Sequence, residues 1–311
     1  MQWPSLPQSL LPVVGAIPAE ILEGAVSGLA EQAGPVRQLL ADGFVPPDIL
    51  TCMTLHLLTH QPRLPTAEAP SKGAIEGGVW VREQVTYHTP PHAEEVLTVA
   101  GQSAARFIRR GRRYGVTVSE TSSLDGRLFA SNCTTGLLSY QMNPQLEDEH
   151  TGLPESDLVI PGPDWTHAAE NPCRARLAQV REGEIFTGPP VQISLEMMRL
   201  RNAGRNHNPI HTDAAVARRE GLTAPIAGGS HVLAFLQAML MEQWGPQCIL
   251  HGAHFDVRWT AQTYADSHIT SVVKVAGATR DELSCELEIM GEDRVVMRGT
   301  LRLPLAPPSP A

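Results

Sequence analysis

The sequence predicts an α+β protein made of two similar halves. In each half, a stretch with apolar residues at helical spacing precedes about four segments in which apolar and polar residues alternate. A sheet that wraps one central helix satisfies both patterns. Two copies in one chain predict that the two sheets join edge to edge, which hides strand edges that would otherwise be exposed.

In the first half, helices are expected at residues 18–34 and 48–60, the second opened by Pro46 and Pro47. Its apolar residues continue around most of the helix, so we expect it to be buried. The alternating segments are residues 79–88, 95–101, 106–120 and 127–140. Asp125-Gly126 is a typical hairpin turn between the last two.

The second half repeats this order after a connection rich in Pro, Gly and acidic residues. A short strand near Ile185 and a helix over 231–241 come first, and strands follow at 250–260, 268–276, 283–290 and 294–303. We therefore divide the chain into an N-terminal domain (1–145), a linker (146–172) and a C-terminal domain (173–311).

Composition excludes some classes of protein. The 311 residues carry a net charge of −9, which disfavours nucleic-acid binding. No run of about 18 apolar residues suggests a membrane span, and the N-terminus is a poor signal peptide. The five cysteines are scattered without a Cys-x-x-Cys pair, which is typical of reduced thiols. We expect a cytoplasmic protein.

The segment 206–213 concentrates the candidate chemistry. The Asn208-Pro209 step stiffens the loop, so Asn206 and His211 can be aimed from a short arc. The imidazole of His211 titrates near neutrality and suits a general acid or base, with Asp213 placed to orient it. The alternative is that Thr212 or Asp213 merely caps a helix over 214–220.

A second candidate segment is 224–230, where Gly228 and Gly229 meet the start of an apolar helix. Free backbone N–H groups and the helix dipole there favour a developing negative oxygen, near Gly229 and Ser230. The alternative is a tight turn with Ser230 as N-cap. An imidazole together with such an oxyanion site is what a reaction through a thioester enolate requires.

These residues resemble a known family. The R-specific enoyl-CoA hydratases, or MaoC-like dehydratases, carry Gly-Asp-x-Asn-Pro-aliphatic-His and, downstream, Pro-Ile-x-x-Gly at the central helix. The matching positions are Asn208, Pro209, Ile210, His211, Pro225, Ile226 and Gly229. The resemblance covers roughly residues 175–303 and implies a double hotdog fold, in which the first half is a degenerate hotdog.

Two positions depart from the family pattern. Arg205-Asn206 stands where the family has Gly-Asp, and Gly228 stands where relatives often have histidine. In the family, the aspartate and the histidine together activate water or remove a proton. An asparagine amide can hold water but cannot accept its proton. His231 is a candidate substitute for the family histidine, although a core or surface histidine is the favoured interpretation.

Three other groups have weaker functional interpretations. On a strand, His251 faces away from His254 and Asp256, so no metal site is expected. Cys52, His56 and His60 share a helix face but spread too far along it for one metal ion, which favours ordinary core histidines. The arginine run at 106–113 is interpreted as a solvated strand and turn, with binding of coenzyme A phosphates as the alternative.

The leading hypothesis is an enoyl hydratase or 3-hydroxyacyl dehydratase acting on an acyl-CoA or acyl-carrier-protein thioester. His211 is the expected acid/base and Asn206 the polar positioner, supported by Arg205, Asn208, Asp213 and His231. No metal or redox cofactor is expected, and we expect a homodimer. The alternatives are a hotdog enzyme of another class (cyclisation, other enolate chemistry or thioester hydrolysis) and a non-catalytic thioester-binding subunit.

Overall fold

The computed structural model describes residues 6–61, 79–138, 142–203 and 208–306. Each half supplies helices followed by four long strands, as the sequence predicts. The first half contains α3 (Pro47–Thr51), α4 (Met53–Thr59), β3 (Val79–Tyr87), β4 (Val96–Arg109), β5 (Arg112–Ser123) and β6 (Leu128–Leu137). The second contains α8 (Gly229–Trp244), β10 (His254–Trp259), β11 (His268–Ala278), β12 (Glu282–Met290) and β13 (Val295–Pro304).

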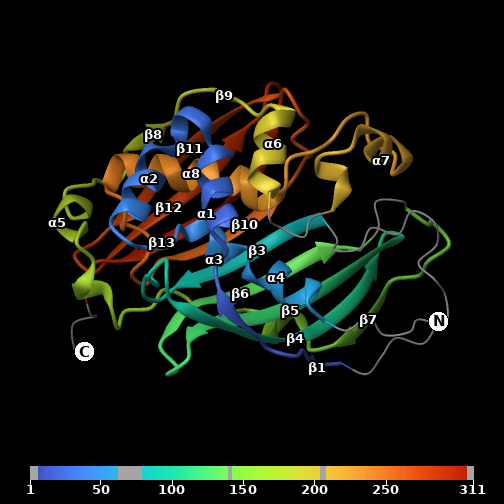
Figure 1. The fold of residues 1–311 in the computed structure, drawn as a ribbon, viewed down its shortest axis with the longest axis horizontal. Coiled ribbons are helices and arrows are strands. Elements are labelled where there is room, and N and C mark those ends of the chain that lie inside the picture. The colour runs from blue at the N-terminus through green and yellow to red at the C-terminus, as the bar shows by residue number, and fades with distance from the viewer. Residues whose placement is uncertain (1–5, 62–78, 139–141, 204–207, 307–311) are drawn as a thin grey trace.

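All of these strands belong to one antiparallel sheet, in the order β4-β5-β6-β3-β10-β13-β12-β11. The two halves meet where β3 pairs with β10, from His254 opposite Thr86 to Arg258 opposite Arg82. The sheet curves around the helices, and α8 packs directly against α3 (Figure 1). The predicted α+β class and the edge-to-edge junction are therefore confirmed.

Shorter elements complete the two halves. Strands β1 (Gln8–Ser9), β2 (Val13–Ala16) and β7 (Glu149–Gly152) pair with β4, while β8 (Ile185–Thr187) and β9 (Val191–Gln192) pair with β11. The remaining α-helices are α1 (Ala19–Ser27), α2 (Gly34–Ala41), α5 (Arg174–Leu177), α6 (Leu195–Asn202) and α7 (Ala214–Arg219). Within the described ranges, no helix is long and apolar enough to cross a membrane, and all five cysteines are free thiols.

The two helices expected in the first half are each broken. The first ends at Ser27, because Ala30 adopts a positive φ of 47°, and the chain continues as a 3-10 turn and then α2. The second divides at Cys52 into α3 and α4. There the Thr51 hydroxyl donates to the Pro47 carbonyl at 3.0 Å, a back-bond that commonly bends helices.

The prediction that one strand ends near residue 101 and the next begins at residue 106 is wrong. The chain runs on as β4 to Arg109, turns at Arg110 and Gly111, and returns as β5. Both turn residues have positive φ, 51° and 72°, which a two-residue hairpin turn requires. The arginine run therefore surrounds a hairpin tip. The turn predicted at Asp125-Gly126 does connect β5 to β6.

A buried ion pair between two helices connects the two halves. Arg201 of α6 contacts Asp48 of α3, and their side chains are only 2% and 3% exposed. Arg201 also packs on Gly28 at the end of α1, where a Cβ would lie 2.7 Å from the arginine Cβ. The pair thus fixes α6, the helix that precedes the candidate loop, against α1 and α3.

Replacing Asp48 with alanine leaves the Arg201 guanidinium buried without its counter-charge. We expect Asp48→Ala to lower the free energy of unfolding by about 3–5 kcal/mol in urea titrations. The double variant Asp48→Leu/Arg201→Met removes both charges and should recover most of this loss. Single variants that lose less than about 1 kcal/mol would show that the pair does not hold the helices together.

Candidate active site

The candidate loop is a compact 3-10 turn, η4 (Pro209–His211), whose shape follows from its sequence. Pro209 occupies the first position of the turn, and the Asn208 side chain caps it by accepting from the Ile210 N–H at 3.1 Å. Ile210 is fully buried and packs with Leu222 and Ile226. The turn is therefore anchored by an apolar residue that points inward, which leaves the next side chain, His211, half-exposed.

The His211 ring is oriented by a backbone carbonyl. Its Nδ1 lies 2.7 Å from the carbonyl oxygen of Ile226. A carbonyl can only accept, so Nδ1 carries the proton and the neutral ring has its lone pair on Nε2. This is the tautomer in which Nε2 can act as a base.

The segment that supplies this carbonyl is itself clamped on both sides. The Ile226 N–H donates to the Ile210 carbonyl at 3.2 Å, and the Ala227 N–H donates to the Thr263 carbonyl at 2.8 Å. On the other side, the Ala265 N–H donates to the Pro225 carbonyl at 2.8 Å. These bonds hold the His211 turn and the start of α8 in one fixed relation.

The N-terminus of α8 opens at this point. Gly228 is the N-cap, and no side chain caps the helix. His231 to Met241 are buried, whereas Gly228, Gly229 and Ser230 remain half-exposed. A Cβ placed on Gly228 would lie 3.9 Å from both Cε1 and Nε2 of His211. The Nε2 edge of the imidazole thus lies beside helix N–H groups that favour a negatively charged oxygen.

An indole ring forms one wall of the site. The Trp259 ring lies against Gly229, where a Cβ would come within 2.9 Å of Cε2. Trp80, from the start of β3, lies 6.0 Å away between ring centroids. Because the indole occupies the space above Gly229, only glycine fits there without displacing the ring.

The other predicted site residues fall in different places. Asp213 is exposed and caps α7, accepting from the N–H groups of Val216 and Ala215, which lower the pKa of its carboxyl. The capping alternative therefore describes Asp213, and the Ile226 carbonyl takes the orienting role. His231 is a core histidine, 2.7 Å from the Gly28 carbonyl and stacked on Phe235. Arg205, Asn206 and His207 lie outside the described residues.

His254 and Asp256, for which no metal site is expected, have other partners. His254 contacts the Thr86 hydroxyl at 2.9 Å, and Asp256 forms a bidentate pair with Arg82 at 2.9 and 2.7 Å. The part of the chain that the structure describes holds no cluster of three metal-ligating side chains. His60 is exposed at the end of α4, so its expected core position is wrong.

A hydrogen-bonded chain that sequence reasoning missed joins three distant residues. His88 lies 2.6 Å from Asp164 through Nδ1 and 3.0 Å from the Ser131 hydroxyl through Nε2. The serine is only 4% exposed, and Asp164 also accepts from the Thr166 N–H. We infer that these hydrogen bonds hold the connection between the halves against the sheet. No local pattern marks it, because its members are far apart in sequence.

Comparisons with known proteins find one family model and several solved structures that resemble this chain. Residues 179–288 match the family model described as MaoC like domain. No curated protein matches the sequence. A MaoC-like dehydratase from Phytophthora capsici superposes with a TM-score of 0.67 at 11% identity, covering 96% of this chain and 95% of that chain.

Two further structures are similar. Rv0216 from Mycobacterium tuberculosis, described as having a double hotdog fold, gives a TM-score of 0.66 at 14% identity and covers 96% of each chain. The peroxisomal multifunctional enzyme type 2 from Drosophila melanogaster gives 0.63 at 15%, covering 94% of this chain and 48% of that chain. At these identities the likeness shows the fold, and the double hotdog prediction is confirmed.

Two adjacent glycines allow a matched test of the site wall. Gly229→Ala drives a methyl group into the Trp259 ring, so we expect it to lower the free energy of unfolding by about 1–3 kcal/mol and to shift tryptophan fluorescence. Gly228→Ala meets only ordinary van der Waals contact with His211 and should change stability by less than about 0.5 kcal/mol. Equal effects of the two substitutions would contradict the placement of the indole.

Proposed function

We propose that the protein is a lyase that hydrates enoyl thioesters or dehydrates 3-hydroxyacyl thioesters. Residues 179–288 match the family model of the MaoC like domain, and the chain has a double hotdog fold. The observation that carries this proposal is the position of His211. Its Nδ1 is fixed by the Ile226 carbonyl, and its Nε2 edge lies beside the uncapped N-terminus of α8.

The proposed reaction uses these two groups together. The thioester carbonyl oxygen accepts hydrogen bonds from the N–H groups near Gly229 and Ser230, which stabilise the enolate that forms. His211 Nε2 takes a proton from water as the water oxygen bonds to the β-carbon. The imidazolium then returns that proton to the α-carbon, so the net change is addition of one water. Asn206 holds the water by its amide.

The substrate is an acyl group carried by coenzyme A or by a carrier protein, and the step as written needs no cofactor. We also propose a homodimer in the cytoplasm. The division into two hotdog domains, 1–145 and 173–311, with 146–172 between them, belongs to the same proposal. In the described part of that connection, β7 pairs with β4.

The proposal predicts the effect of removing the imidazole. With a panel of enoyl and hydroxyacyl thioesters, the wild-type protein should gain or lose one water, detected by mass. His211→Ala should slow this turnover about 10²–10⁴-fold, the usual contribution of a general acid/base. His268→Ala, at an exposed histidine on β11, is the control and should leave turnover unchanged.

Restoring the family carboxylate is the complementary test. Asn206→Asp should raise hydration, because a second group could then accept the proton of water. If Asn206→Asp instead abolishes a different native reaction, the chain is a hotdog enzyme of another class. If turnover survives His211→Ala unchanged, the catalytic assignment of this loop fails.

A further inference from the structure

Three arginines lie side by side on the outer face of the sheet, where the two halves join. Arg258 on β10 lies directly opposite Arg82 on β3 and directly opposite Arg298 on β13. Side chains in such positions are about 5 Å apart at their Cβ atoms, and like charges there destabilise a sheet. This arginine row therefore gathers positive charge at a cost in stability.

Other facing charges on this side of the second half have opposite signs. Lys274 on β11 lies opposite Glu286 on β12 and contacts it at 3.2 Å. Arg298 lies opposite Glu288 and contacts it at 3.4 Å. The position of Arg258 between two arginines departs from this arrangement. Residues that lower stability in this way are typical of binding sites, where function opposes stability.

Arg258 is the member of the row that has no acidic partner. Asp256 forms its bidentate contact with Arg82, and Glu288 is taken by Arg298. Among the residues that the structure describes, none forms an ion pair with Arg258, and its side chain is exposed. Its guanidinium donors therefore face solvent, in the planar arrangement that binds phosphate oxygens. In a chain with a net charge of −9, such an uncompensated cation favours an anionic ligand locally.

The row lies at the same end of the sheet as the candidate active site. Trp259 follows Arg258, and successive residues of a strand point to opposite faces, so the indole lies on the helix side. There it contacts Gly229 at the start of α8. Strand β10 ends at Trp259. A long, flexible arm that leaves the helix N-terminus can therefore pass round the end of the strand to the arginine row.

The arginine run at the tip of the β4–β5 hairpin offers less free charge. The backbone N–H of Arg110 donates to Asp148 at 2.9 Å, and the Arg109 guanidinium lies 3.9 Å from Glu155. Arg109 also lies over the Phe107 ring, 5.5 Å from its centroid. Acidic and aromatic neighbours thus already occupy part of this run.

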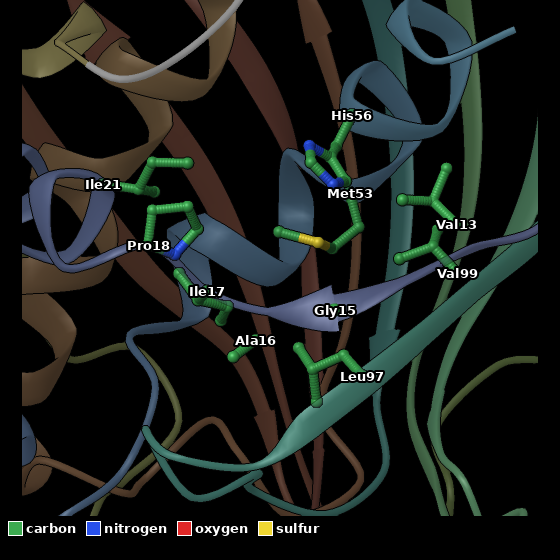
Figure 2. A pocket seen from close by; sticks show the side chains of 10 residues that line it. All are labelled: Val13, Gly15, Ala16, Ile17, Pro18, Ile21, Met53, His56, Leu97 and Val99. Carbon is green, nitrogen blue, oxygen red and sulfur yellow. The ribbon is translucent and has the colours of Figure 1, made fainter.

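The cavity between α4 and the sheet does not suit an anion (Figure 2). Its lining is mostly apolar and includes Met53, Leu97 and Val99, together with His56. Burial, and to a lesser degree the nearby His60, lower the pKa of His56, so this imidazole is neutral at pH 7. The volume of about 30 Å³ has room for roughly one or two water molecules. The arginine row is therefore the better place for a charged group.

We propose that Arg258, flanked by Arg82 and Arg298, binds a phosphate group of the carrier to which the acyl thioester is attached. Coenzyme A and the phosphopantetheine of a carrier protein both have such a group at the end of the pantetheine arm. The arm then connects the row to the thioester at the start of α8. This inference rests on the proposed function for the position of the thioester, but it concerns binding, so it is tested without turnover.

The test compares butyryl-CoA with butyryl-pantetheine, which lacks the phosphates, by isothermal titration calorimetry. Both thioesters are saturated and cannot be hydrated. The wild-type protein should bind butyryl-CoA more tightly. Arg258→Gln should weaken binding of butyryl-CoA about tenfold, the loss of roughly one charge-assisted hydrogen bond. Affinity for butyryl-pantetheine should change by less than about twofold, because that ligand does not reach the row.

A third thioester, butyryl-4′-phosphopantetheine, identifies the phosphate that is bound. If Arg258→Gln weakens its binding as much as that of butyryl-CoA, the row holds the phosphate next to the arm, which both carriers have. If the substitution weakens butyryl-CoA alone, the row holds a nucleotide phosphate and the carrier is coenzyme A.

Thermal unfolding separates a binding role from a structural one. Arg258→Gln removes a positive charge that lies opposite two others, so the Tm of the ligand-free protein should stay the same or rise. An arginine that only supports the fold would instead lower the Tm and weaken both butyryl-CoA and butyryl-pantetheine. That result would overturn the inference.

The matched control is Arg280→Gln, at an exposed arginine in the turn between β11 and β12, at the other end of the sheet. It removes the same charge and should leave the preference for butyryl-CoA intact; an equal loss would reduce the effect to net charge and contradict the proposed site. Equal affinity of the wild-type protein for butyryl-CoA and butyryl-pantetheine would also overturn it, while leaving the lyase proposal standing. Intact discrimination without turnover would count against the lyase activity alone.

Discussion

The pairing of β3 with β10 is the constraint on which the rest of the molecule depends. Its register, with Arg258 opposite Arg82, joins the two halves into one sheet and removes two exposed strand edges. The bidentate contact between Arg82 and Asp256 spans the same junction on the outer face. Because β10 ends at Trp259, this register also brings the indole of one half next to Trp80 of the other, beside the start of α8.

Within that frame, Ile226 sets the geometry of the candidate site. Its carbonyl fixes the tautomer of His211, its N–H bonds to Ile210, and its side chain belongs to the same small buried cluster. One residue thus couples the position of the base to the position of the helix N-terminus. Both groups have to act on the same few atoms of a thioester, so their fixed spacing matters more than the strength of either contact.

Local chemistry explains which features could be predicted from the sequence. The Asn208-Pro209 turn and the glycine start of α8 depend on neighbouring residues, and both could be predicted. The break at Cys52 could not, because it accompanies a hydroxyl that also contacts Tyr87 from a distant strand. The Trp259 wall and the carbonyl that holds His211 depend on long-range packing, which leaves no periodic signal. Asn206 remains a prediction, because it lies outside the described residues.

The sheet surface that packs on the helices is polar in the first half and apolar in the second. Thr134 and Glu83 of the first half lie opposite each other, and Val257 of the second half lies opposite Glu83. The apolar face of the second half packs around α8 and supplies hydrophobic stabilisation. The polar face of the first half reduces this hydrophobic stabilisation. Glu83 in addition makes the free energy of unfolding depend on pH. The folded state holds the Glu83 proton more tightly than the unfolded chain, so its contribution to stability is complete below about pH 4.5 and is lost as the pH rises through about 8. The Thr134 and Asn132 side chains hydrogen-bond to this carboxyl and so offset part of the cost of burying it.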